Sequence, residues 1–398
     1  MITVEEALRL IKNQTTDYGT EEIELKHSIG RILQETVVAD RDFPPYNRVT
    51  MDGIAFQYEA FENGRMTFEI EGVAAAGAAQ FTLSSSDNCL EVMTGSIMPL
   101  QADVVVRYED VEIEGNLATV LVDRIKLRQN VHGKGTDRRA KSEIISKGVM
   151  ISPAEIGVAA SVGKAKVKVS KVPRVLIIST GDELVEVHET PEAHQIRRSN
   201  VFLLQTTLQH YKIDADTAHL NDDLKTIKTS LALFLENYDL IVMSGGVSKG
   251  KFDFLPEALT ALGVEKHFHK IKQRPGKPFW FGKHPKGTLV FALPGNPVSS
   301  FLCTHRYLMP WLKDSLGLKY QTPITAALAA PINFKPDLTY FAQVKLTSGA
   351  DGKLLAHPTE GNGSGDFANL VDADAFIEIP RGKDLFEVGE VYPVYLYR

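Results

Sequence analysis

The chain has 398 residues, of which 43% are hydrophobic and 24% are charged, and its net charge is −6. The length predicts two to four domains, and the composition is that of an ordinary globular protein. The acidic balance argues against a general nucleic-acid binder, although a local cluster of donors can still hold a small anionic ligand. The sequence has no apolar run near the roughly 18 residues of a membrane span, so we expect no membrane association.

Residues 1–14 predict an amphipathic helix with acidic residues in its first turn. They lack the basic start, apolar stretch and cleavage site of a signal peptide. Cys89 and Cys303 lie far apart in apolar contexts without CxxC spacing, which predicts reduced core thiols. We therefore expect a cytoplasmic protein.

Residues 43–138 carry short β-like runs separated by glycine and asparagine turns, with a hairpin tip expected at 114–116. The runs are 66–71, 90–93, 104–108 and 118–122. Three polar loops lie among them, containing Asp52, Thr94 and Asp137. Taken alone, each loop reads as a turn.

A repeated strand–loop–helix pattern begins near residue 173 and ends near 316. Continuous apolar runs predict parallel strands that are buried on both faces, at 175–180, 239–243 and 288–292. Helical patterns follow at 200–211, 224–236 and 297–316. We expect Asp223 to cap the second helix, and Asn296 and Pro297 to begin the third. The alternation predicts βαβ units and a doubly wound sheet.

The C-terminal residues 320–398 are again β-like, with runs at 342–346, 375–379 and 391–397. The predicted fold is multidomain: a central doubly wound α/β domain flanked by β-rich N-terminal and C-terminal modules. The predicted domains are an α/β domain (1–23 with 173–318), a linking β domain (24–42 with 139–172), a β-rich lid module (43–138) and a C-terminal β-barrel-like domain (319–398).

Three glycine-containing loops follow the predicted parallel strands, at 181–184, 244–250 and 294–300. Ligands of open α/β sheets bind beyond the carboxyl ends of the strands. Gly245 and Gly246 let the backbone approach a phosphate, and a helix beginning at Pro297 offers free N–H groups to an anion. One such loop is more often only a tight turn, but three at one edge favour a binding site for a phosphate-bearing ligand.

Charged residues lie near the same edge. Asp182, Glu183, Asp222 and Asp253 form an acidic group, and carboxylates beside phosphates commonly share Mg²⁺ with them. Helix capping explains Asp222 about equally well, whereas no helix follows Asp182 and Glu183 directly. The segment 270–278 holds four cations beside proline and glycine, which favours anion binding over a merely solvated surface. The histidines show no zinc-ligand spacing with cysteine.

Seven motifs, in chain order, resemble molybdopterin molybdenumtransferases, the MoeA and gephyrin E-domain family. They are TMDG at 50–53, MTG at 93–95, STGDEL at 179–184, SGGVS at 244–248, RPGKP at 274–278, LPGNPVS at 293–299 and GNGSG at 361–365. The resemblance covers essentially the whole chain. It implies an elongated, four-domain homodimer, in which the α/β domain of one subunit faces the Asp52 module of the other.

The resemblance implies insertion of molybdate into adenylylated molybdopterin, with Mg²⁺ and with release of AMP. We hypothesise that a molybdate oxygen attacks the phosphoanhydride phosphorus while Mg²⁺ and the cations offset its charge. The implied catalytic residues are Asp52, Thr94, Asp137, Glu183, Asp222 and Asp253, with Asp182 and Glu183 as metal ligands. The implied substrate-binding residues are Gly181, Asp182, Ser244, Gly245, Gly246, Ser248, Lys270, Arg274, Lys277, Pro294, Gly295, Asn296, Pro297 and Ser299.

The sequence departs from the family pattern at several positions. Lys251 stands where Asp is common, Arg274 where Lys is common, and arginines usual near 132–133 and 338–343 are replaced. We expect the loss of the usual arginines to weaken oxyanion binding or to move it onto the segment 270–277.

Two alternatives remain open. One is a molybdopterin adenylyltransferase-like enzyme, and the flanking β modules argue against it. The other is a non-catalytic pterin-binding or scaffold protein, and the intact acidic residues argue against it. A molybdopterin adenylyltransferase is an expected partner.

Overall fold

The computed structural model describes residues 1–247, 254–319, 322–359, 363 and 365–398. The chain divides into two compact units. The first comprises Met1–Gln34, Gly148–Ser152 and Val167–Arg398, and the second comprises Glu35–Lys147 and Pro153–Lys166. Within the described ranges, no helix has the length and apolar character needed to cross a membrane.

A six-stranded sheet forms the centre of the first unit, in the order β16-β13-β17-β21-β20-β18. Its strands are β13 (Val175–Thr180), β16 (Asp216–Leu220), β17 (Leu240–Ser244), β18 (Glu265–His269), β20 (Trp280–Lys283) and β21 (Leu289–Leu293). The first four strands in the sheet order are mutually parallel, and β20 pairs antiparallel with both of its neighbours, β21 and β18. The predicted strands are therefore confirmed as β13, β17 and β21, whereas the other three were not predicted.

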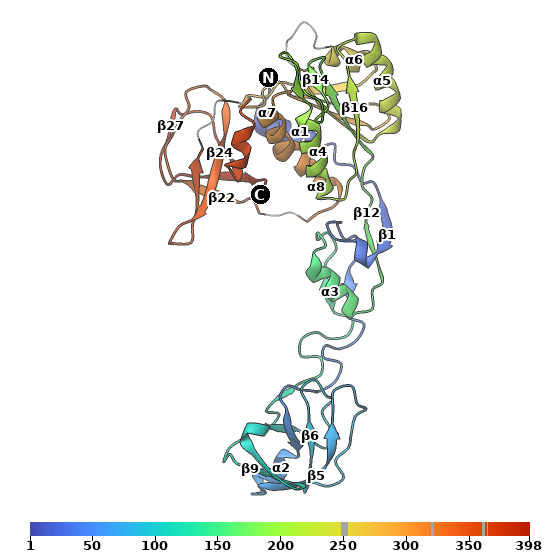
Figure 1. Ribbon diagram of the computed structural model, residues 1–398, viewed down its shortest axis with the longest axis vertical. Helices are drawn as coiled ribbons and strands as arrows, with labels where there is room; N and C mark the ends of the chain where they lie inside the picture. The colour runs from blue at the N-terminus through green and yellow to red at the C-terminus, as the bar shows by residue number, and fades with distance from the viewer. Residues whose placement is uncertain (248–253, 320–321, 360–362, 364) are drawn as a thin grey trace. The chain divides into compact units, whose positions relative to one another are not determined.

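Helices cover both faces of this sheet (Figure 1). Successive strand residues point to opposite faces: Val175 and Ile177 pack in the core that includes α1, α4, α7 and α8, while Leu176 and Ile178 pack in the core of α5 and α6. The helices are α1 (Val4–Lys12), α4 (Ser199–Gln209), α5 (Leu224–Asn237), α6 (Leu255–Ala261), α7 (Pro297–Cys303) and α8 (Met309–Ser315). This two-sided cover confirms the doubly wound fold.

The predicted helix starts are confirmed. Asp223 caps α5, because its side chain accepts a hydrogen bond from the Thr226 amide. Asn296 is the N-cap residue of α7 and Pro297 is its first residue. The long helix from Pro297 contains a π-helical turn, η3 (Thr304–Leu308), between α7 and α8.

The C-terminal part of the first unit is a second six-stranded sheet, in the order β19-β24-β25-β22-β28-β26. Its strands are β19 (Gln273–Arg274), β22 (Thr325–Leu328), β24 (Thr339–Ser348), β25 (Leu354–Pro358), β26 (Ala375–Ile379) and β28 (Val391–Leu396). A further pairing between β24 and β26 closes five of these strands into a ring. The predicted β-barrel-like module is therefore present. Strand β19 joins it from the α/β region by pairing in parallel with β24.

The second unit contains a third six-stranded sheet, in the order β7-β4-β6-β5-β9-β8. The strands are β4 (Gly53–Phe56), β5 (Thr67–Ala74), β6 (Asn88–Val92), β7 (Val104–Arg107), β8 (Val111–Glu114) and β9 (Leu117–Val120). Strands β8 and β9 form the hairpin expected around 114–116. Cys89 lies in this core and Cys303 in the α/β core; both are buried free thiols, as predicted.

Short elements complete the two units. They are β1 (Thr20–Glu24), η1 (Leu25–His27), β2 (Val37–Val38), β3 (Arg48–Val49), α2 (Tyr58–Glu62), η2 (Tyr108–Asp110), β10 (Val131–His132), β11 (Glu143–Ile145), α3 (Pro153–Ser161), β12 (Lys166–Ser170), β14 (Leu184–Val185), β15 (Ile196–Arg197), β23 (Ile332–Asn333), η4 (Ala368–Val371) and β27 (Leu385–Phe386). Strand β1 pairs with β12, and β2 pairs with β11. These pairings connect residues on either side of the 43–138 segment, but the four-domain boundaries stay a prediction.

Candidate active site

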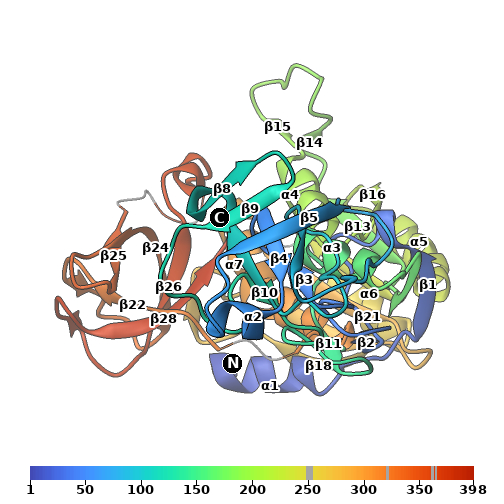
Figure 2. The ribbon, with the colours of Figure 1, turned by 90° about the horizontal axis from the view of Figure 1, so that it is seen from below.

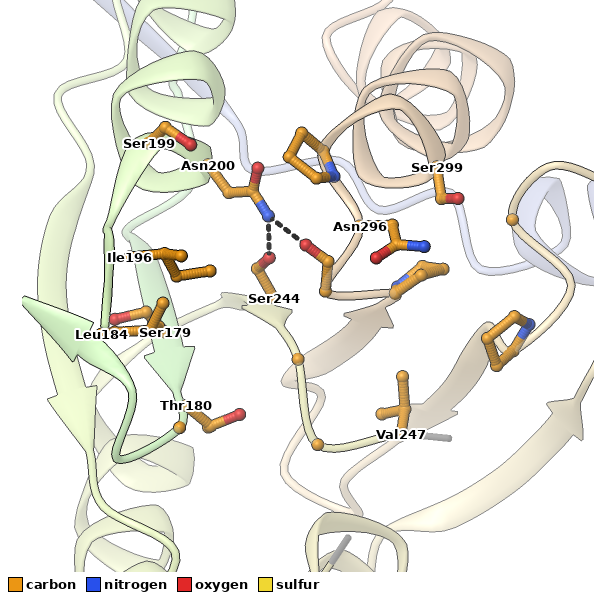
Figure 3. A pocket seen from close by; sticks show the side chains of 18 of the residues that line it. Ser179, Thr180, Leu184, Ile196, Ser199, Asn200, Ser244, Val247, Asn296 and Ser299 are labelled. Carbon is orange, nitrogen blue, oxygen red and sulfur yellow. Dashed lines mark hydrogen bonds between the residues drawn. The ribbon is translucent and has the colours of Figure 1, made fainter. Parts of the chain in front are cut away.

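A pocket of about 790 Å³ lies at the carboxyl edge of the parallel strands. Ser179 and Thr180 end β13, Ser244 ends β17, and the loop after β21 leads into α7. The structure therefore brings the three predicted glycine-containing loops to one cavity (Figure 3). The predicted site residues that line it are Gly181, Glu183, Asp222, Ser244, Gly245, Gly246, Arg274, Lys277, Pro294, Gly295, Asn296, Pro297 and Ser299.

Asn200, in the first turn of α4, ties two of these loops together. Its Nδ2 donates to the Ser244 hydroxyl at 2.7 Å and to the Gly295 carbonyl at 2.7 Å, as Figure 3 shows. Its Oδ1 and the hydroxyl of Thr180 are buried and have no hydrogen-bond partner among the described residues. Buried polar atoms are costly unless they are paired, so these two atoms are a local cost to stability at the pocket wall.

The Gly245–Gly246 turn allows the backbone to line the pocket. Both residues have positive φ, at 104° and 67°. A Cβ on Gly245 would lie 2.8 Å from the Thr180 hydroxyl, and a Cβ on Gly246 would lie 2.7 Å from a Leu255 methyl group. Only glycine fits such positions without strain, which leaves main-chain groups rather than side chains at this wall.

Among the residues that the structure describes, four cationic side chains line the pocket: Arg197, Arg198, Arg274 and Lys277. The first two were missed in the sequence, where two successive arginines before Ser199 and Asn200 at a helix start were the available signal. Arg198 pairs with Glu186, and Arg197 donates to the Glu189 carbonyl at 3.1 Å. Both contacts anchor the loop between β14 and β15, which Figure 2 shows extending away from the sheet.

Two predicted residues of the α/β region, Asp182 and Lys270, are not among the described residues that line the pocket. Asp182 accepts a hydrogen bond from the Asp222 amide at 3.1 Å, so its carboxylate supports the neighbouring loop. Lys270 has a φ of 76°, and its backbone pairs with Ile2 and Phe279. Ser248 and Asp253 lie outside the described residues, as does Lys251.

The second unit holds the other predicted polar residues. Asp52 and Thr94 meet: the Asp52 carboxylate accepts hydrogen bonds from the Thr94 amide at 2.6 Å and from its hydroxyl at 2.8 Å. Both bonds hold the pKa of Asp52 below its ordinary value, and the bond from the backbone amide is the larger cause. Asp137 instead pairs with His132, whose Nε2 lies 2.9 Å from a carboxylate oxygen. All of these groups except His132 are exposed.

The pocket carboxylates are suited to a divalent cation. Within the described ranges, no group of three His, Cys, Asp or Glu side chains has metal-binding geometry. Mg²⁺ needs fewer protein ligands, because it usually binds one or two carboxylates together with substrate phosphates and water. The Glu183 carboxylate folds over Gly181, where a Cβ would lie 2.4 Å from its Oε2, and Asp222 shares the pocket wall. Glu183 and Asp222 therefore fit Mg²⁺ in the presence of a phosphate ligand.

The fold and the pocket define a class of protein: a doubly wound α/β protein with a glycine-walled pocket, lined by cationic side chains, at the carboxyl edge of its sheet. Comparisons with known proteins narrow this class. Residues 2–163 match the MoeA N-terminal region (domain I and II), residues 176–314 match a probable molybdopterin binding domain, and residues 325–397 match the MoeA C-terminal region (domain IV).

Full-length relatives agree. The chain is 40% identical to a molybdopterin molybdenumtransferase of Synechocystis sp., over 100% of both chains. It is 30% identical to one of Staphylococcus epidermidis, over 99% of this chain and 95% of the relative. A MoeA protein from Pyrococcus horikoshii, described as a molybdopterin biosynthesis protein, superposes with a TM-score of 0.85 at 26% identity, covering 100% of both chains. The chain belongs to the molybdopterin molybdenumtransferase family.

Proposed function

We propose that the chain inserts molybdate into adenylylated molybdopterin and releases AMP, in an Mg²⁺-dependent reaction. The observation that carries this proposal is the pocket at the sheet edge. It combines a glycine backbone wall, the start of a helix, several cationic side chains and the Glu183 carboxylate in one cavity. An anionic substrate with a phosphoanhydride matches this set of groups.

Each part of the pocket has a separate task in the proposed reaction. Main-chain groups of Gly245 and Gly246 contact the phosphate-bearing part of the pterin substrate, while Arg274 and Lys277 hold the molybdate oxyanion. Asn200 holds the Ser244 and Gly295 loops together and so fixes the shape of the pocket wall. Glu183 and Asp222 would hold Mg²⁺, which offsets negative charge on the phosphoanhydride. The matches to MoeA regions on both sides of the α/β domain favour insertion over adenylylation.

An assay with adenylylated molybdopterin, molybdate and MgCl₂ tests this function. We expect AMP release together with cofactor that activates a molybdenum-free apoenzyme, and both signals should disappear when EDTA removes Mg²⁺. Omission of molybdate is the matched control. Absence of AMP and of active cofactor from the complete mixture would show that the proposed function is wrong.

We further propose a homodimer in which the Asp52 region of one subunit completes the pocket of the other. The support is chemical: the pocket carries the cations, and the Asp52–Thr94 pair is an exposed hydrogen-bonded carboxylate with a lowered pKa. Closed two-fold dimers are the commonest oligomers, and each dimer would contain two such sites.

Complementation tests the shared site. Glu183→Ala and Asp52→Ala should each be inactive alone. After the two variants are unfolded and refolded together in equal amounts, about a quarter of wild-type activity should return, because half of the dimers are mixed and each mixed dimer has one intact site. Recovery of no activity, with mixed dimers demonstrated by differently tagged subunits, would contradict an intersubunit site.

Two finer proposals complete this picture. We propose that a molybdopterin adenylyltransferase supplies the substrate, since the insertion reaction requires an adenylylated pterin. We also propose a cytoplasmic location, supported by two buried cysteines that remain free thiols.

A further inference from the structure

A buried glutamine lies directly under the loop that carries two of the pocket cations. Gln273 has no exposed surface, and its Nε2 donates to the Pro275 carbonyl at 3.0 Å and to the Gly276 carbonyl at 3.3 Å. Its Oε1 accepts a hydrogen bond from the hydroxyl of Tyr307, which is also fully buried. Both ends of the amide are therefore satisfied, as a buried polar group requires.

The amide is closely packed against the loop at Gly276. Gly276 has a φ of 83°, and a Cβ there would lie 2.7 Å from Nε2 of Gln273 and 2.8 Å from the Cys303 sulfur. The same Nε2 lies 3.6 Å from that sulfur. The Gln273 amide thus fills the space behind the loop and fixes the direction of two carbonyl groups.

The direction of those carbonyls matters for an anion. A carbonyl oxygen carries partial negative charge, so an oxygen turned toward the pocket would repel an oxyanion bound by Arg274 and Lys277. Gln273, Pro275 and Gly276 line the cavity together with Arg274 and Lys277, and because both carbonyl oxygens are bound to Gln273, the cationic side chains are the groups that the loop offers to an anion.

We propose that Gln273, held by Tyr307, is a positioning residue for the molybdate oxyanion. Its side-chain amide holds the Pro275 and Gly276 carbonyls by hydrogen bonds, and this keeps Arg274 and Lys277 at the pocket wall. The inference rests on the proposed function for the identity of the anion, and it assigns to this buried pair a role in anion affinity and not in the chemical step.

The first test is Gln273→Met, which keeps the approximate size of the side chain but removes both hydrogen-bonding groups. We expect the KM for molybdate to rise about tenfold, corresponding to one or two lost hydrogen bonds, while kcat at saturating molybdate changes by less than about twofold. Tyr307→Phe should raise KM by a smaller factor, because the two donor contacts of Gln273 remain. The Tyr307→Phe variant also provides a test if Gln273→Met does not fold.

Gln205→Met is the matched control. Gln205 also donates its side-chain amide to a carbonyl, that of Ala215, at 2.9 Å, but it does not line the pocket. Its variant should lose stability without any change in the KM for molybdate. If Gln273→Met behaves like this control, or lowers kcat at unchanged KM, the inference is overturned.

Equilibrium dialysis with molybdate alone separates this inference from the proposed reaction. Weaker molybdate binding by Gln273→Met and by Tyr307→Phe, relative to wild type, supports the positioning role even where AMP release fails. Equal binding by all three proteins contradicts the role even where the wild type is an active insertase. A wild-type protein that binds no molybdate overturns the inference, while the proposed function is decided separately by AMP release.

Discussion

The two units hold their polar site residues in different ways. In the first unit, a buried frame positions the pocket: Ser244, Gln273 and Ser299 are almost fully buried, and Asn200 bonds to two loops at once. In the second unit, Asp52 and Thr94 are exposed and depend on each other. The pocket is therefore set by several buried contacts, whereas Asp52 and Thr94, 42 residues apart in the chain, are held together by two exposed hydrogen bonds.

This difference leads to a general expectation about substitution. A change in the buried frame should alter both stability and ligand affinity, because the same buried contacts stabilise the fold and position the pocket loops. A change in the exposed pair should alter chemistry with little effect on stability, since exposed side chains contribute little to unfolding free energies. Three predictions examine the comparison, in order of expected size.

The largest effect is expected where an exposed carboxylate belongs to the pocket itself. Glu183→Ala should lower AMP release by about 10²-fold or more, a typical loss when a group that offsets transition-state charge is removed. Because Glu183 is exposed, the unfolding free energy in urea should remain near that of wild type. The control is Glu265→Ala on the edge strand β18, which should keep full activity. Wild-type turnover by Glu183→Ala would remove this carboxylate from the site.

The next effect concerns pH and a histidine in the helix that begins at Pro297, in the same unit as the pocket. Burial lowers the pKa of His305, in the π-helical turn, to about 4, with Lys313 and His210 as smaller causes. In the unfolded chain the imidazole binds a proton below about pH 6.5, whereas in the folded chain it stays neutral down to about pH 4. The contribution of His305 to the free energy of unfolding is therefore complete above about pH 6.5 and is lost as pH falls toward 4. Between pH 7 and pH 5 we expect a loss of about 2 kcal/mol from this residue.

Urea unfolding of wild type and His305→Leu at both pH values measures this loss. The leucine variant should show a smaller decrease, and the exposed His194→Leu should keep the wild-type decrease. Parallel pH profiles for all three proteins would mean that His305 does not couple folding to protonation.

The smallest effect should come from the exposed pair. Thr94→Val removes the hydroxyl bond to Asp52 but leaves the backbone bond, so the pKa of Asp52 should rise part of the way to its ordinary value. The pair stabilises the fold above the unfolded carboxyl pKa, and this contribution disappears as pH falls through the lowered native value. Carboxyl NMR titration follows the pKa directly, with Thr119→Val as the control. An unchanged pKa would show that the hydroxyl contact is unimportant.

The sequence alone predicted the features that depend on local pattern. Strands β13, β17 and β21 are continuous apolar runs that end in glycine-containing loops, so the pocket edge was accessible to prediction. Strands β16 and β18 escaped prediction because they are partly exposed and contain charged residues. Edge strands carry a weak hydrophobic pattern for the same reason.

The residues that arrange the pocket depend on contacts between distant parts of the chain. Asn200 meets Ser244 and Gly295, and Gln273 meets Tyr307, only after folding. Amide and hydroxyl side chains at such positions have no distinctive spacing in the sequence. Arg197 and Arg198 were visible as a pair, but their place at the cavity follows from the loop between β14 and β15.

The pairing of β19 with β24 has a consequence for protein engineering and for gene fusion. Gln273 and Arg274 lie opposite Thr339 and Tyr340, so the loop that carries the cations is hydrogen-bonded to the C-terminal barrel. An excised α/β domain would keep its sheet but would lose the edge that supports this loop. The proposed anion site therefore cannot be transferred with the α/β domain alone: a graft of this domain must also include strand β24 of the barrel.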